Sequence, residues 1–142
     1  MNIKPVKNYG KSIASAVNEL CIAKAEADML KLPQAECSVS HMFGPGVYIR
    51  QVTLPADTYA IGHHQNFEHQ NIVLSGRVTM VNSDGTTTEI CAPAVFVGKP
   101  GRKIGYVHED TVWLNVYPTE EKDIETQIGR ASCRERVWIK CR

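Results

Sequence analysis

Residues 62–76 read GHHQNFEHQNIVLSG, and the spacing of histidines and apolar residues in this stretch decides the fold. Alternate residues of a β-strand point to the same face, so His63 and Gln65 project together while His64 points away. After a short crossing, His69 begins a second strand and shares its face with the residues two and four positions later. The stretch therefore predicts two short strands that carry imidazole and amide groups.

Short β-rich runs surround this stretch over most of the chain. Turn residues separate the runs, among them Ser83-Asp84-Gly85 and Pro100-Gly101, where glycine suits a type II turn because it accepts a positive φ. Eight strands are predicted, at residues 47–54, 58–62, 71–74, 78–82, 87–91, 94–97, 103–107 and 111–117. Evenly spaced short strands indicate an antiparallel sandwich or barrel, and jelly rolls are one such solution.

Residues 12–31 are expected to form one N-terminal α-helix, with Ser12 as its N-cap and Pro33 as its stop. Its apolar residues fall on one stripe at helical spacing: Ile13, Ala16, Val17, Leu20, Ala23, Ala27 and Leu30. This stripe is expected to pack on the barrel or on a second subunit.

The stretch at 62–76 resembles the first sequence motif of the cupin family, in which two histidines one residue apart precede a glutamate and then a glycine. Counting back from Gly76, His69 occupies the glutamate position, Gln65 the second histidine and His63 the first. The resemblance implies a cupin-type antiparallel β-barrel, or jelly roll, with one N-terminal α-helix.

Residues 98–108, GKPGRKIGYVH, stand where the second cupin motif is expected. Gly101 keeps the turn of that motif, Ile104 replaces its histidine, and His108 stands at its asparagine position. Positions 104, 106 and 108 share a strand face, so His108 is expected to reach the same interior as His69. Small single-domain cupins, including ones carried by bacteriophages, are similar to this chain over about residues 34–126.

The histidines predict a site for a divalent transition metal. Neutral imidazole nitrogen is a good ligand for Fe, Mn, Ni, Cu and Zn, whereas an amide oxygen is weaker, so the identity of the metal stays open. The predicted ligands are His63, Gln65, His69 and His108, and Tyr106 is the candidate catalytic acid or orienting hydroxyl.

Several alternatives to this ligand set remain. His63 and His64 can instead be solvated residues at a strand end, and His108 can cap a turn. Glu68 can replace Gln65 as a carboxylate ligand, although strand parity disfavours this. Three other interpretations are structural: His41 is expected in a loop before the barrel, Trp113 in the core, and the cysteines as reduced thiols.

Two classes of function follow from the resemblance. The first is a metal-dependent, dioxygenase-like enzyme that acts on a small organic molecule. The second is a non-enzymatic cupin that binds a small ligand or serves as a phage accessory or assembly protein. A smaller alternative is a metal-independent isomerase or lyase in which a histidine is the general base.

Charge and composition bound the partners. The formal net charge is +1, but residues 128–142 carry five basic residues and one acidic residue, so the remainder has a net charge of −3. Residues 128–137, IGRASCRERV, resemble an in-frame translation of a sequencing-adapter oligonucleotide, which makes 128–142 a non-native tail. The expected organisation is a helical segment at 1–33, a cupin domain at 34–127 and this tail.

The mildly acidic domain argues against a nucleic-acid partner, and the sequence has no run of eighteen apolar residues or secretory signal. We therefore expect a cytoplasmic protein with a small-molecule ligand, no membrane partner and a homodimeric assembly.

Overall fold

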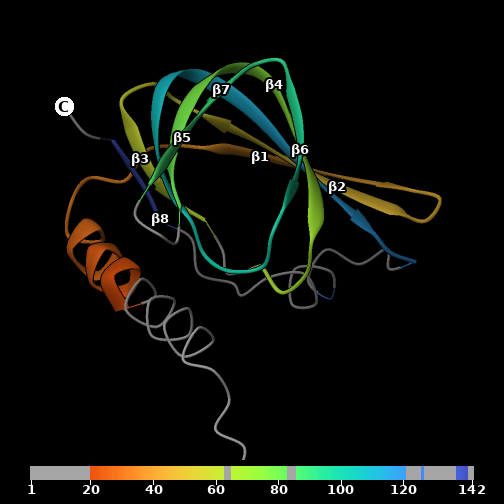
Figure 1. Ribbon diagram of the computed structural model, residues 1–142, viewed down its shortest axis with the longest axis horizontal. Coiled ribbons are helices and arrows are strands. Elements are labelled where there is room, and N and C mark those ends of the chain that lie inside the picture. Colours follow the sequence, from red (N-terminus) through yellow and green to blue (C-terminus); the bar gives the residue numbers. More distant parts are fainter. Residues whose placement is uncertain (1–19, 63–64, 83–85, 121–125, 127–136, 141–142) are drawn as a thin grey trace, which may run out of the picture.

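Antiparallel strands make up almost all of the fold. The computed structural model describes residues 20–62, 65–82, 86–120, 126 and 137–140. Its strands are β1 (Ser38–Gly44), β2 (Val47–Leu54), β3 (Thr58–Ile61), β4 (His69–Val81), β5 (Thr87–Cys91), β6 (Ala94–Gly98), β7 (Ile104–Pro118) and β8 (Val137–Lys140). Every pairing between these strands is antiparallel. They curve around a shared interior (Figure 1), so the predicted jelly-roll class is confirmed.

Two of the predicted strand breaks are absent. The runs 71–74 and 78–82 join in the 13-residue β4, and the runs 103–107 and 111–117 join in the 15-residue β7. The apolar pattern is interrupted because the pairing of β4 with β7 shifts register between Val73 and Val78. A β-bulge of this kind bends a strand without ending it.

Two strands were not predicted. Strand β1 pairs with β2, and its inward residues are Val39, His41 and Phe43, so a histidine interrupts its apolar face. Strand β8 pairs with β3 and lies within the segment interpreted as a non-native tail. Residues 128–136 lie outside the described residues, and the domain boundaries stay a prediction.

The interior is apolar at one end of the barrel. Val52 and Leu54 of β2, Val78 of β4 and Val107 of β7 form a buried cluster there. On β4 the buried residues are 69, 71 and 73 before the register shift and 78 after it, so the inward face changes parity along the strand. The register shift therefore decides which side chains of β4 enter the barrel.

The N-terminal helix is described over residues 20–29, and it packs on the barrel through a different stripe from the predicted one. Leu20 and Leu30 are 71% and 56% exposed, whereas Ile22 is buried against Ile61 of β3. Glu26, on this buried side, forms an ion pair with Arg102.

This ion pair is well shielded, because both side chains are 11% exposed. The ion pair favours the orientation of the helix in which Glu26 faces Arg102, because a buried charge without its partner is strongly destabilising. Arg102 also donates from Nε to the carbonyl of Gly62 (3.1 Å), so the helix is linked to the segment that precedes His63. The expected residues 12–19 lie outside the described part. No helix in that part has the length and hydropathy needed to cross a membrane.

Gly76 offers a test of the register shift. Its φ is +94°, and an added Cβ would lie 2.6 Å from the carbonyl oxygen of Asp110 and overlap Thr111. Gly101 is the matched control, because its φ is +114° but an added Cβ would meet nothing within 4 Å. We expect Gly101→Ala to cost about 1 kcal/mol and Gly76→Ala roughly 3 kcal/mol, measured by urea unfolding with tryptophan fluorescence. Equal costs for the two variants would contradict this account of β4.

Candidate functional site

Two rows of inward-facing residues form a polar end of the barrel interior. They cross the strands β1, β2, β7, β4 and β6, which pair in that order. The first row holds Phe43, Tyr48, Tyr117, His69 and Gly98. The second row holds His41, Arg50, Asn115, Asn71 and Phe96. Arg50 is 6% exposed and His69 is 7% exposed, so this end buries groups that are costly to remove from water.

Aromatic rings stack across the first row. The ring centroids of Tyr48 and Tyr117 are 5.6 Å apart, and those of Tyr117 and His69 are 5.2 Å apart. The hydroxyl of Tyr48 lies 2.7 Å from Nδ1 of His41, so a histidine stands at each end of the pair of tyrosines. The stack fixes the positions of polar atoms with few rotatable bonds.

Tyr117 connects the stack to Gln65. Its hydroxyl donates to Oε1 of Gln65 at 2.8 Å. Burial raises the pKa of Tyr117 to about 12, so the hydroxyl keeps its proton at neutral pH. The backbone of Gln65 is itself held by Gly101 through a pair of hydrogen bonds of 3.0 and 2.9 Å. Gln65 and Gly101, from the two motifs, are thus brought together.

Hydrogen bonds orient the side chains of Asn71 and His69. Oδ1 of Asn71 accepts from Trp113 Nε1 (2.9 Å) and from Asn115 Nδ2 (2.6 Å). The indole of Trp113 can only donate, so the oxygen of Asn71 must face it. The carbonyl of Phe67 can only accept, so Nδ1 of His69 donates to it at 3.1 Å, and in the neutral ring Nε2 carries the lone pair.

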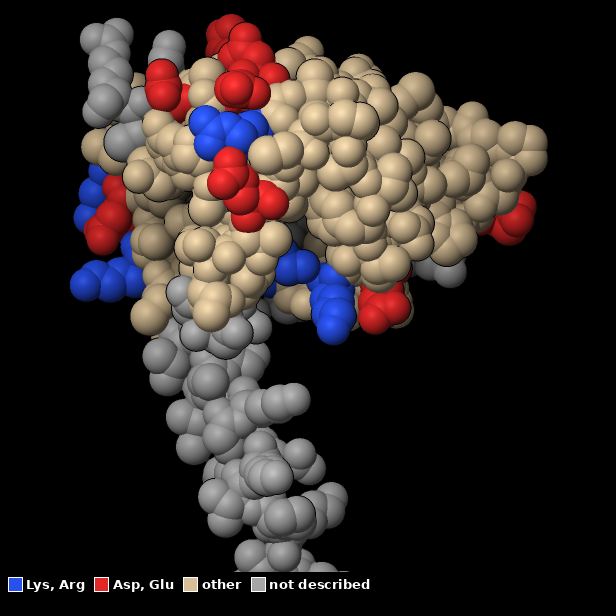
Figure 2. Space-filling model, turned by 45° about the horizontal axis from the view of Figure 1, so that its top comes forward, with Lys and Arg blue, Asp and Glu red and all other residues tan. Residues whose placement is uncertain are grey.

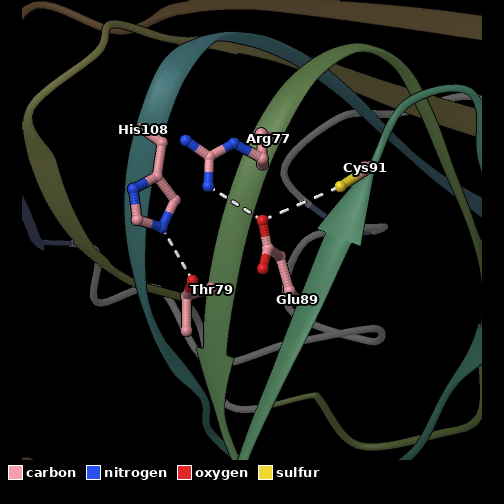
Figure 3. A network of polar contacts seen from close by, with 5 residues as sticks. All are labelled: Arg77, Thr79, Glu89, Cys91 and His108. Atoms are coloured by element: carbon pink, nitrogen blue, oxygen red, sulfur yellow. Dashed lines mark hydrogen bonds and ion pairs between the residues drawn. The ribbon is translucent and has the colours of Figure 1, made fainter.

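His108 and Tyr106 lie on the opposite face of β7 from the buried Val107. Nε2 of His108 is 2.7 Å from Oγ1 of Thr79, beside the Arg77–Glu89 ion pair (Figure 3). His108 therefore contacts β4 and not the polar end in this arrangement, and its place in the metal ligand set stays a prediction.

Tyr106 follows the same outward parity. Its hydroxyl donates to Oδ1 of Asp57 at 3.0 Å, and its ring contacts Tyr59 and His108. Periodicity correctly placed positions 104, 106 and 108 on one face. It did not specify whether that face is the inner or the outer one.

Other predicted residues have different outcomes. His41 is not in a loop but on β1, and it faces the interior. Glu68 is exposed, as strand parity predicted, while Trp113 packs against the core cluster. His63 and His64 lie outside the described residues.

The described residues do not by themselves complete a metal centre. Within them, no three His, Cys, Asp or Glu side chains are grouped closely enough to hold a metal ion. Of the predicted ligands, His69 and Gln65 are at the polar end, and the oxygen of Gln65 already accepts from Tyr117. The metal ligand set stays a prediction.

Similar chains exist among solved structures. A protein from Neisseria meningitidis has a TM-score of 0.51 and 11% identity, covering 65% of this chain and 93% of that one. Ectoine synthase from P. lautus has a TM-score of 0.54 and 11% identity, covering 72% of this chain and 78% of the other. A cupin-2 domain containing protein from Shewanella frigidimarina has a TM-score of 0.48 and 14% identity, covering 66% and 91%.

The fold is an antiparallel β jelly roll, and it is similar to that of ectoine synthase from P. lautus. At these identities the similarity shows the fold alone. No protein-family model and no curated protein sequence matches the chain. The fold does not determine the function, because folds of this kind support many chemistries, so the function has to be argued from the site residues.

The state of His69 predicts a pH dependence of stability. Burial lowers the pKa of His69, and the nearby Lys103 cation acts in the same direction. The unfolded chain therefore takes up this proton at a higher pH than the folded chain, so stability is lost as the pH falls below the ordinary histidine value of 6.5. We expect the Tm to fall between about pH 7.5 and about pH 5.5, and to fall less in His69→Gln. An equal decrease of the Tm in the two proteins would show that folding does not change the pKa of His69.

Proposed function

We propose that this cupin-fold protein binds a small molecule against the polar end of its barrel interior. The observation that supports the proposal is the contrast between the two ends of one interior. Val52 and Val107 fill one end with aliphatic groups, while Arg50, His69 and Asn115 lie buried at the other. Apolar side chains at these positions would make folding more favourable, because each polar group loses its hydrogen bonds to water on burial.

The polar end has the composition of a ligand site. Small-molecule sites combine aromatic and apolar walls with a few fixed polar groups that set orientation. The stacked rings of Tyr48 and Tyr117 are such walls, and the hydrogen bonds of His69 and Asn71 fix their polar atoms. We take binding as the primary function, and a phage accessory or assembly role is a finer version of it.

Thermal-shift measurements against a collection of small organic molecules test this proposal. A ligand of the polar end is expected to raise the Tm of the natural chain, by about 2.7 kcal/mol of stabilisation at a hundredfold excess over Kd. The shift is expected to disappear in Arg50→Gln and in Tyr117→Phe. His108→Gln is the control, since His108 lies on the outer face and its loss leaves the interior unchanged. A ligand-induced Tm shift that disappears in His108→Gln but persists in Arg50→Gln and Tyr117→Phe would refute the proposed position of the site.

A metal centre is the second candidate, and the tautomer of His69 favours it. Because Nδ1 donates to the carbonyl of Phe67, the lone pair lies on Nε2, the arrangement usual for metal-binding histidines. A bound transition metal would supply Lewis acidity and open positions for dioxygen, as the dioxygenase interpretation requires. Gln65 and His63 would be the neighbouring ligands, and His108 would not take part.

Metal analysis separates the two candidates. If a metal is bound at the polar end, protein purified without chelators contains about one first-row transition metal per chain. His69→Ala is then expected to lose the metal, whereas His108→Ala is expected to keep it. Elemental analysis by plasma mass spectrometry gives both values. Metal that disappears in His108→Ala and remains in His69→Ala would contradict the interior position.

A further inference from the structure

The N-terminal helix packs where two segments of the polar end join the sheet. Ile61 of β3 and Ile104 of β7 form the last pair of the β3–β7 ladder. Ile22 of the helix is buried against Ile61, and Ile104 packs against the same cluster. Gly62 directly follows Ile61, and Lys103 directly precedes Ile104. The helix therefore contacts the two chain segments at the point where they leave this ladder.

Hydrogen bonds join these two segments to each other. The amide of Gly62 donates to the carbonyl of Lys103 at 3.1 Å. Gln65 and Gly101 exchange the pair of backbone hydrogen bonds described above. Arg102 adds a side-chain contact, because its Nε donates to the carbonyl of Gly62 at 3.1 Å. The backbone of Gln65 is therefore positioned by residues 101–103.

Arg102 connects these hydrogen bonds to the helix. Its Nη1 forms the ion pair with Oε2 of Glu26 while its Nε holds the carbonyl of Gly62. The guanidinium is planar and rigid, so each contact constrains the other. Figure 2 shows charged side chains of both signs at the surface of one face, where water weakens ion pairs. The two side chains of the Glu26–Arg102 pair are instead only 11% exposed, so loss of one partner is strongly unfavourable for the other.

Gln65 carries this connection into the polar end. Its backbone is bonded to Gly101, the neighbour of Arg102, and its Oε1 accepts from the hydroxyl of Tyr117 at 2.8 Å. The ring of Tyr117 stacks on that of His69, with centroids 5.2 Å apart. Contacts thus run without a break from the helix to the ring stack. Contiguous networks of this kind can couple distant parts of a protein.

We propose that the N-terminal helix positions Gln65 at the polar end, with Glu26 and Arg102 as positioning residues. While the helix is packed on the barrel, Glu26 holds Arg102, and Arg102 holds the segment that carries Gln65. When the helix separates from the barrel, the charge of Arg102 turns toward water and the carbonyl of Gly62 loses its donor. The role of Gln65 in a ligand site rests on the function proposed above.

Amide hydrogen exchange of the full chain, followed by NMR, tests the positioning. Glu26→Gln removes the charge of the carboxylate and keeps the size of the side chain. Asp28→Asn is the matched control, because Asp28 lies on the same helix but is 62% exposed and pairs with Lys31 at 3.5 Å. We expect the amides of Gln65 and Gly101 to exchange about tenfold faster in Glu26→Gln, and at the rate of the natural chain in Asp28→Asn.

The amides of the β4–β7 ladder show whether this effect is local. A substitution that only lowers the stability of the whole fold accelerates the exchange of these amides as well. Loss of positioning is expected to accelerate Gln65 and Gly101 while the ladder amides keep their rates. Ile22→Val is a milder second variant, because it weakens the apolar contact with Ile61 and changes no charge. It is expected to accelerate the same two amides by a smaller factor.

Unchanged exchange of Gln65 and Gly101 in Glu26→Gln overturns the proposal, and so does an increase that the ladder amides share equally. If Glu26→Gln does not fold, the same criteria apply to Ile22→Val. The measurement needs no ligand, so it separates the positioning from the proposed function. A chain that gives no thermal shift with any small molecule but shows the selective increase supports the positioning and contradicts only the ligand site.

Discussion

The pairing of β4 with β7 is the constraint on which the rest of the structure depends. These two strands are the longest, and β7 also pairs with β2 and β3 while β4 also pairs with β5 and β6. Most other strands are therefore positioned by their register on this pair. Because strand residues alternate between faces, that register decides which side chains enter the barrel. The polar end exists because Asn71 and Asn115 face each other across this ladder.

The register shift between Val73 and Val78 gives one strand two different inward patterns. Before the shift β4 contributes His69 and Asn71 to the polar end, and after it Val78 joins the aliphatic cluster. Gly76 lies at the shift with a positive φ and with the backbone of β7 so close that a side chain has no room. The glycine that carries the resemblance to the first cupin motif is thus explained by local geometry. Its role is to bend the strand that connects the two ends of the interior.

The sequence predicted the fold class and most strands because apolar alternation and turn residues are local signals. Strand parity also predicted that Glu68 faces away from His69. The inward or outward choice for His108 was not a local signal. It depends on which face of β7 the other strands cover, and periodicity is the same for both faces. The face of the N-terminal helix that packs on the barrel was predicted wrongly for the same reason. Contacts with the barrel decide whether the stripe of Leu20 and Leu30 or the stripe of Ile22 is buried.

His41 was missed for a related reason, because β1 has two adjacent polar residues, Ser40 and His41, which interrupt the apolar alternation of a strand. Once β1 is placed, the two faces of the five-stranded sheet depart from the usual distribution. The inner face combines aromatic rings with buried arginine, asparagine and histidine, whereas the outer face carries valine, isoleucine and leucine beside serine and glutamine. A sheet that served only to form a core would have the opposite distribution, because burial favours apolar groups and water favours polar ones. Packing of the barrel alone does not account for either face. The ligand proposed for the polar end would account for the buried polar groups of the inner face.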